Sequence, residues 1–245
     1  MIANAQSGTS IDEVATGIYR ISTPVDIPAI PGGFTFNQYL IVDDEPVLFH
    51  TGLRRLFPLT QEAISKAMPV ARLRHIGFSH FEADESGALN EFLAVAPQAA
   101  PLSSDVGAMV SVNDVADRLG RGLADGERMS TGAHELEWIY TPHVPHGWDC
   151  GLLFDHTTGT LFSGDLFTQA GSKHPPLTHS DILEPSEMMR KAMDYFAHGR
   201  GTQAILERLA ALRPKMLACM HGSAYSGDGA MLLRGLAAKL AQEAG

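Results

Sequence analysis

Three stretches near the start of the chain have the hydrophobic pattern of β-strands. They cover residues 16–21, 36–42 and 46–50, and a polar turn at 43–45 separates the last two. Short runs rich in Ile, Val, Phe and Tyr between turn residues are typical of strands. The pattern predicts an antiparallel sheet in this part of the chain. The polar stretch before it, residues 1–15, is expected to be only loosely held.

From residue 59 onwards, helical and strand patterns alternate. Apolar positions spaced by three and four predict helices, whereas short apolar runs between turn residues predict strands. The predicted helices cover residues 59–68, 86–93, 187–197, 202–212 and 230–242, and the predicted strands cover residues 75–79, 135–140, 151–155, 159–164 and 215–220. These strands are too apolar to leave the inner face of either sheet in water. We therefore expect an α/β (α+β) fold in four αββα layers, with helices flanking two mixed β-sheets, and a single domain over residues 1–245.

Two segments do not fit this alternation. Residues 105–132 contain a helical pattern near 110–119 and then a Gly-rich stretch whose fold is not assigned. Residues 168–184 form a long loop with two prolines and with His174 and His179. Long loops that follow a ligand-bearing strand are often functional. This loop is a candidate cover for a site, and its histidines are candidates to reach it.

Charge and composition narrow the classes of partner. The net charge is −10, and the 18 Lys and Arg residues are not clustered. A nucleic-acid partner is not expected, because such binding depends on neutralising phosphates, and an acidic surface also repels anionic membranes. Residues 1–15 lack the features of a secretory signal and no stretch approaches a membrane span, so a cytoplasmic location is expected. The two cysteines, Cys150 and Cys219, are interpreted as core thiols.

Metal-ligating residue types gather where predicted strands end. His80, Glu82 and Asp84 lie between a strand and a helix, a pattern that alone is also compatible with a solvated turn and a helix cap. His146 follows another strand, and Asp165 and His221 each end one. Three imidazoles and three carboxylates are enough for two metal ions with one bridging carboxylate.

With these residues the sequence resembles the metallo-β-lactamase superfamily, and within it the diiron β-lactamase-like domain of flavodiiron proteins and their stand-alone relatives. The resemblance spans nearly the whole chain. Residues 36–41, Phe-Asn-Gln-Tyr-Leu-Ile, are similar to that family's Asn-Ser-Tyr-Leu-Ile strand. Residues 146–149, His-Gly-Trp-Asp, are similar to its His-Trp-Pro-Asp. Residues 161–167 and the pair His221–Gly222 complete the resemblance.

The resemblance implies a ligand set. Carried over by position, one iron would be bound by His80, Glu82 and His146, the other by Asp84 and His221, and Asp165 would bridge them. Superfamily hydrolases carry a second His where this chain has Glu82. Zinc has no redox chemistry, whereas an added anionic oxygen donor stabilises a ferric state, so the exchange favours a site that cycles oxidation state.

Two further residues have open roles. Glu85 stands where the family usually has a His, so it is a candidate metal ligand, a candidate to orient a ligand or water, or a helix cap. Tyr195 matches an aromatic position whose hydroxyl faces the metals in the family, and it is our candidate catalytic residue; the alternative is a core tyrosine. His143 is a candidate to support His146. The other histidines, His50, His75, His134, His156 and His198, are interpreted as ordinary hydrogen-bonded or solvated residues.

The leading functional prediction is a non-haem diiron oxidoreductase that binds or reduces dioxygen or nitric oxide. Flavodiiron proteins carry a flavodoxin-like domain with FMN, and no such segment is expected here. Electrons would then come from an external donor, such as a flavoprotein or a rubredoxin-like protein. One alternative is an oxygen or NO sensor without fast turnover, and another is a dinuclear zinc hydrolase. The resemblance also raises the expectation of a homodimer.

Overall fold

The computed structural model describes residues 1–243, and within these residues it contains an eight-stranded and a seven-stranded sheet. The first sheet follows the order of the chain from β1 to β8. Its strands are β1 Ile2–Asn4, β2 Thr9–Ala15, β3 Ile18–Ile27, β4 Ile30–Ile41, β5 Val47–Phe49, β6 His75–Gly77, β7 Ala100–Ser104 and β8 Arg121–Leu123. Pairing is antiparallel from β1 to β5 and parallel from β5 to β8.

The second sheet has the order β13-β15-β14-β12-β11-β10-β9. Its strands are β9 Arg128–Ser130, β10 Glu135–Tyr140, β11 Gly151–Asp155, β12 Thr160–Gly164, β13 Leu177–Thr178, β14 Met216–Cys219 and β15 Ala224–Ser226. Strands β12 and β14 pair in parallel, so both sheets are mixed.

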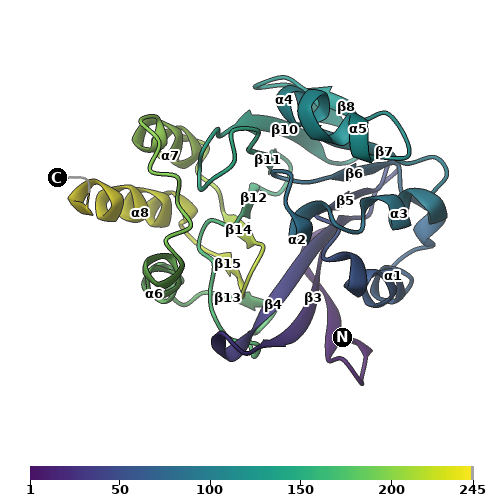
Figure 1. Cartoon of the computed structure of the whole chain (residues 1–245), viewed down its shortest axis with the longest axis horizontal. Helices are drawn as coiled ribbons and strands as arrows, with labels where there is room; N and C mark the ends of the chain where they lie inside the picture. Colours follow the sequence, from purple (N-terminus) through teal and green to yellow (C-terminus); the bar gives the residue numbers. More distant parts are fainter. Residues whose placement is uncertain (244–245) are drawn as a thin grey trace.

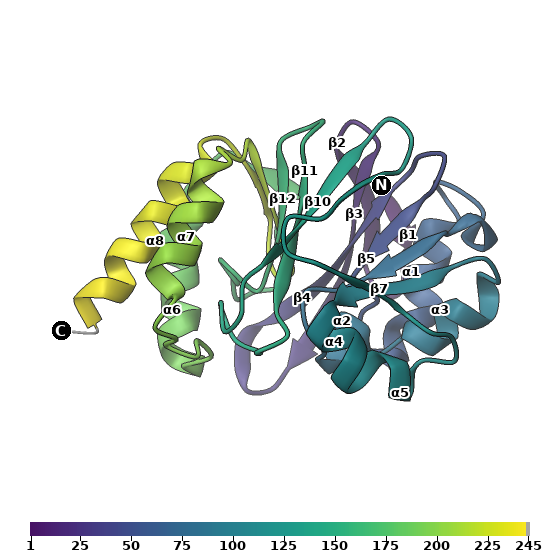
Figure 2. The ribbon, with the colours of Figure 1, turned by 90° about the horizontal axis from the view of Figure 1, so that it is seen from above.

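Helices cover the outer face of each sheet (Figures 1 and 2). On the first sheet lie η1 Arg54–Leu56, α1 Phe57–Ile64, η2 Val70–Arg72, α2 Ala83–Ser86, α3 Leu89–Val95, α4 Asp105–Gly107, η3 Ala108–Val112 and α5 Asn113–Val115. On the second sheet lie α6 Leu183–Met193, α7 Thr202–Ala211 and α8 Gly229–Glu243. Figure 2 shows the resulting four layers of helices, sheet, sheet and helices. The predicted αββα sandwich is thus confirmed.

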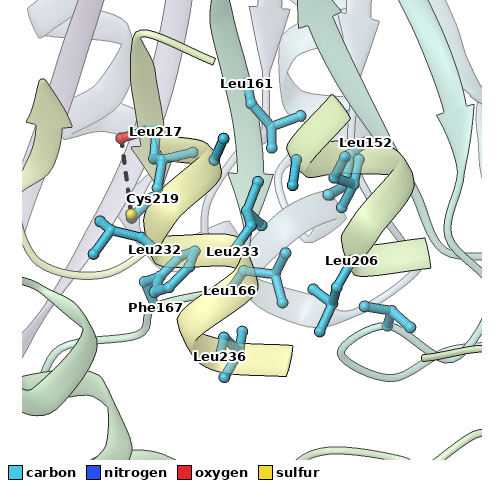
Figure 3. Close-up of a cluster of buried hydrophobic side chains, with 14 of the residues drawn as sticks. Leu152, Leu161, Leu166, Phe167, Leu206, Leu217, Cys219, Leu232, Leu233 and Leu236 are labelled. Atoms are coloured by element: carbon cyan, nitrogen blue, oxygen red, sulfur yellow. Dashed lines mark hydrogen bonds between the residues drawn. The ribbon is translucent and has the colours of Figure 1, made fainter. Parts of the chain in front are cut away.

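Apolar side chains fill the spaces between the layers. Leu206, Leu233 and Leu236 of α7 and α8 pack on Leu161 and Leu217 of the second sheet (Figure 3). A separate cluster between the sheets contains Trp138, Phe162, Tyr39 and Phe49. Truncating one such buried Leu to Ala costs about 2–5 kcal/mol of folding free energy. The metal-binding candidates lie at one end of this inter-sheet core.

The prediction of a loose segment at residues 1–15 was wrong. Residues 2–4 and 9–15 form β1 and β2, and Ile11 of β2 pairs with Ile21 of β3. Thr9 and Ile11 alternate inward and are buried, while their neighbours are more accessible. This period-two pattern is short and polar, so the hydrophobic count alone did not reveal it.

Several predicted boundaries also differ. Helix α6 begins at Leu183 and ends at Met193, rather than spanning 187–197, because Asp194 adopts a left-handed conformation with φ of 49°. The unassigned segment 105–132 contains α4, η3 and α5 followed by β8 and β9, and its helical turns end at Val115. Within residues 1–243, none of the helices is long and apolar enough to cross a membrane.

Candidate metal centre

Four chain segments bring the predicted ligands to one place between the two sheets. His80 lies three residues after β6, and Glu82 immediately precedes α2. His146 lies in the loop between β10 and β11, Asp165 directly follows β12, and His221 lies two residues after β14. Near the centre of Figure 1, α2 lies beside the ends of β12 and β14. Segments that follow strands of both sheets therefore bring these side chains together.

We call His80, Glu82 and His146 the outer half of the site. The Nε2 atoms of His80 and His146 lie 3.1 and 3.0 Å from the same Oε2 of Glu82. The carboxylate oxygen Oδ2 of Asp165 lies 3.6 Å from His80 Nε2 and 3.4 Å from His146 Nε2. Four donor atoms thus surround a space suited to one cation.

We call Asp84, Glu85 and His221 the inner half; Glu85 is included because it stands at the family position of a ligand to the second metal, and its carboxylate lies within 4.8 Å of that of Asp84. His221 Nε2 lies 3.4 Å from Asp84 Oδ2 and 3.3 Å from Asp165 Oδ1. Asp165 therefore directs one carboxylate oxygen to each half. A carboxylate in this position can bridge two metal ions, because each of its oxygens can bind a different one.

Glu85 is fully buried, and neither of its carboxylate oxygens has a hydrogen-bond partner among residues 1–243. Its Oε2 lies 3.9 Å from His80 Nε2. A carboxylate that caps a helix accepts backbone N–H bonds, so the helix-cap interpretation of Glu85 was wrong. Because buried charges are normally paired or bind metals, the two remaining interpretations are a metal ligand and a residue that orients one.

Backbone carbonyls fix the ring orientation of two of the histidines. His146 Nδ1 donates to Tyr195 O at 2.9 Å, and His221 Nδ1 donates to Thr35 O at 2.7 Å. Since a carbonyl only accepts, Nδ1 carries a proton, and a neutral ring then directs the Nε2 lone pair into the site. An Nε2 lone pair facing carboxylate oxygens needs a cation between them, which is either a proton or a metal ion.

The pKa values in the cluster follow from these contacts. Burial opposes charge on His221, but the contacts with Asp165 and Asp84 raise its pKa to about 9. Hydrogen bonds with His146 and then His80 lower the pKa of Glu82 to about 2. Burial raises the pKa of Glu85 well above its ordinary value. Protons and metal ions therefore compete for the same lone pairs, so metal binding should release protons.

The donor set fits two metal ions. Glu85 and Oδ1 of Asp165 are buried polar groups whose oxygens lack hydrogen-bond partners among the described residues. Three imidazole nitrogens and four carboxylates converge, with the bridging carboxylate between the halves. This set is richer in anionic oxygen than a histidine-dominated zinc site. Two metal ions would also satisfy the buried oxygens that the protein leaves without hydrogen-bond partners.

A buried relay behind His80 was missed by the sequence reasoning. Ser79 Oγ lies 3.0 Å from His80 Nδ1 and 3.1 Å from His50 Nε2. His50 is fully buried, and burial lowers its pKa to about 3. It was interpreted as an ordinary histidine, although it directly follows β5 just as the ligands follow their strands. The strand-end rule used for the ligands would have flagged it.

The first sheet holds the loop that carries His221. Asn37 Nδ2 donates to Cys219 O and Gly222 O, both at 2.9 Å, and Tyr39 Oη donates to Cys219 O at 2.8 Å. Gly222 has φ of +90°, and a Cβ there would lie 2.6 Å from Cβ of Gln169. The Asn-x-Tyr motif in β4 and the His-Gly pair are therefore two sides of one contact between the sheets.

A cavity of about 140 Å³ opens beside the cluster. Its lining combines ligand candidates with Phe34, Met189, Met193 and Tyr195. The Tyr195 hydroxyl donates to the backbone carbonyl of Asp165 at 3.0 Å, and its ring lies edge-on to His146. Tyr195 therefore lies at the site, but just after α6 rather than within a helix.

The remaining histidines lie elsewhere. His174 Nε2 donates to Ala170 O at 3.0 Å, and His179 Nδ1 donates to Ser226 O at 2.8 Å. His143 is exposed, beside the backbone of Gly147. Loop 168–184 therefore brings Thr168, not its histidines, to the cavity. Four other histidines each have a carboxylate within hydrogen-bond distance, as expected of ordinary histidines. They are His75, His134, His156 and His198.

The fold and the placement of the site define a metallo-β-lactamase-type domain. The chain belongs to the family described as ODP family beta lactamase, whose model matches residues 34–222.

Among curated relatives, a putative diflavin flavoprotein A 1 from Thermosynechococcus vestitus is 27% identical over 79% of this chain and 34% of its own length. An anaerobic nitric oxide reductase flavorubredoxin from Salmonella arizonae is 24% identical over 68% of this chain and 35% of its own length. The chain thus spans about a third of the length of these relatives.

Solved structures share the fold. A mutant flavo di-iron protein from Thermotoga maritima superposes with a TM-score of 0.83 at 20% identity, covering 95% of this chain and 61% of the other. The rubredoxin oxygen:oxidoreductase from Desulfovibrio gigas gives 0.77 at 20% identity, covering 96% and 61%.

Proposed function

We propose that this protein is a non-haem diiron protein that binds or reduces dioxygen or nitric oxide with electrons from an external donor. The observation that carries the proposal is the position of Asp165, whose two oxygens face separate groups of His and carboxylate donors. Glu82 supplies a further anionic oxygen shared between His80 and His146. Hard anionic donors favour iron that changes oxidation state over zinc, which does not.

The size of the cavity favours a small ligand. Its volume of about 140 Å³ is well below the ~300–1,000 Å³ usual for sites that enclose drug-sized molecules. Phe34, Met189 and Met193 make part of its wall apolar. A diatomic gas fits such a space, whereas a lactone or thioester substrate would need a larger one. The names of two relatives, a nitric oxide reductase and an oxygen oxidoreductase, support the same class of ligand.

The chain's own residues have separate roles in this proposal. Two bound irons would supply electrons to the gas. Asp165 holds the two halves at bridging distance, and the carbonyls of Tyr195 and Thr35 keep the Nε2 atoms of His146 and His221 directed inward. Tyr195 is the candidate proton or hydrogen-bond donor. Its hydroxyl now donates to Asp165 O, so it must rotate to reach a ligand in the cavity.

Exposed apolar side chains flank the ligands and provide a surface for the electron donor. Phe81 follows His80 and is 37% exposed, and Trp148 lies close after His146 and is 60% exposed. Met193, at the cavity wall, is 57% exposed. Aromatic and Met side chains are enriched in protein interfaces. We propose that a flavoprotein or rubredoxin-like donor docks over these residues.

Metal content is the first test. The full chain is expressed with iron and zinc both supplied, purified without a metal-affinity tag or chelator, and analysed by mass spectrometry. About two irons per chain and a near-ultraviolet ferric band are expected. Two zincs with negligible iron after anaerobic purification would instead point to a zinc hydrolase.

A turnover assay then separates catalysis from sensing. Consumption of O₂ or NO is measured with a generic flavoprotein reductase, and Trp148→Ala should slow it without changing metal content. If the iron-loaded protein binds a gas but shows no sustained consumption, it is a sensor rather than a reductase.

A further inference from the structure

A second cavity, of about 370 Å³, lies against the support of His221. Thr35 connects the metal centre with this cavity, because its carbonyl accepts from His221 Nδ1 while its side chain lines the cavity. The cavity lies between β2, β3 and the segment 172–176. Its polar lining includes Ser10, Asp12, Arg20, Ser22, Ser172 and His174. None of the candidate metal ligands lines this cavity.

Arg20 is the unusual member of this lining. It is only 1% exposed, and no carboxylate of residues 1–243 forms an ion pair with it. One guanidinium nitrogen, Nη2, donates to Gly222 O at 2.6 Å, while the buried Nε has no acceptor among the described residues. Buried guanidinium groups are normally paired with an anion, because loss of hydration is costly. Asn37 also donates to Gly222 O, so supporting that carbonyl does not by itself require a charge.

The other charged groups in the cavity compensate the charge of Arg20 only in part, because Asp12, its cross-strand neighbour on β2, forms no ion pair with it. Asp12 lines the cavity, but it is ion-paired with the amino group of Met1. His174 is half-buried, and burial together with the positive charge of Arg20 lowers its pKa. The Thr35 hydroxyl accepts from Gly222 N at 2.8 Å, which leaves its own proton free to donate. The cavity therefore combines one buried cation with several hydroxyl donors.

We propose that this cavity binds a small oxyanion, either phosphate or a carboxylate. Arg20 is the charge partner, and Thr35, Ser10 and Ser22 supply neutral hydrogen bonds. A planar guanidinium with two parallel N–H groups matches the geometry of both anions. Anion binding in this cavity does not depend on which metal the centre holds, so its test is separate from the test of the diiron proposal.

The test is calorimetric titration of the full, metal-loaded chain with inorganic phosphate and, separately, with succinate. We expect saturable binding of one anion per chain. The anion with the lower Kd identifies the ligand class, either phosphate or carboxylate. Arg20→Met should weaken binding at least tenfold. Ser172→Asp, which adds a negative charge to the partly accessible side of the cavity, should weaken it by a similar factor.

Two matched variants serve as controls. Ser172→Asn changes the same side chain without a charge, and Arg55→Met removes an exposed cation outside the cavity, so both should bind as the wild type does. If Arg20→Met fails to fold, the comparison of Ser172→Asp with Ser172→Asn still tests the proposal. The proposal is overturned if neither anion shows saturable binding up to about 10 mM, a concentration above the Kd of even a weak specific site. It is also overturned if all four variants bind equally, since phosphate would then be on the metals.

Discussion

The two halves of the metal centre use similar donors but are held differently. In the outer half, the side chain of Glu82 is 53% exposed and that of His146 is 25% exposed, and His146 is supported by the carbonyl of a connecting segment. In the inner half, Glu85 is fully buried and His221 is supported by a strand of the opposite sheet. A contact between the sheets thus holds His221 in the inner half, whereas a contact between loops holds His146 in the outer half.

The largest effect is expected at the residue that joins the halves. Asp165→Asn replaces a bridging carboxylate with a neutral amide, so both metals should be lost. The affinity should fall by more than about 100-fold, beyond the ~10–100-fold typical of losing a supporting partner. Metal analysis after dialysis at fixed free iron measures this, with Asp181→Asn, an exposed carboxylate outside the site, as control. Retention of one full equivalent would show that the halves do not share Asp165.

Glu85→Gln and Glu82→Gln form a pair that distinguishes the halves. Without metal, Glu85→Gln should raise the thermal midpoint by about 2–6 °C at neutral pH, because it removes a buried carboxylate without partners, while metal affinity should fall. The half-exposed Glu82 forms hydrogen bonds with His80 and His146, so Glu82→Gln should not stabilise the metal-free chain. Calorimetry of both metal-free variants provides the measurement. An unchanged metal affinity in Glu85→Gln would exclude Glu85 as a ligand.

Loss of the Ser79 hydroxyl behind His80 should have an intermediate effect on metal affinity, confined to the outer half. Ser79 is a hydroxyl that both donates and accepts, so the orientation of its proton depends on His50. Ser79→Ala should weaken one of the two metals by about 10–100-fold and leave the other in place. Titration followed by the ferric absorption band resolves the two steps. Ser163→Ala, a buried serine next to Cys219, is the matched control. Equal loss of both metals would contradict the division into halves.

The smallest effect is expected at Asp43, a carboxylate outside both halves. Slight burial opposes the shift, but hydrogen bonds from Ala133 N, Thr131 Oγ1 and His134 N lower its pKa from 3.8 to about 2. A group with a lowered pKa contributes stability above its unfolded pKa, and that stability is lost as the pH falls through the folded pKa. Asp43→Asn should therefore lower the thermal midpoint at pH 6 and have less effect near pH 2. An equal effect at both pH values would rule out this linkage.

Much of the fold and of the ligand set could be predicted because both depend on local patterns. His80, Asp165 and His221 each follow an apolar run, and the end of a strand is visible in one sequence. The supporting contacts were not visible, since Thr35 and Asn37 reach residues more than 180 positions away.

Arg20 shows the same limit. It lies in the predicted strand of residues 16–21, where the local pattern does not indicate the burial of a charged residue, and it contacts the loop of the second sheet at Gly222. The segment containing β1 and β2 was misjudged for a related reason, because pairing with β3 rather than local hydrophobicity orders it.

The contacts around His221 also determine how metal ions exchange. Asn37 and Tyr39 of one sheet hold the backbone carbonyls of Cys219 and Gly222 of the other, so the backbone that carries His221 is fixed by contacts between the sheets. His146 needs only a loop movement that breaks its contact with Tyr195. Such local openings are far more frequent than global unfolding. An ion bound at the outer half should therefore exchange faster than an ion bound at the inner half.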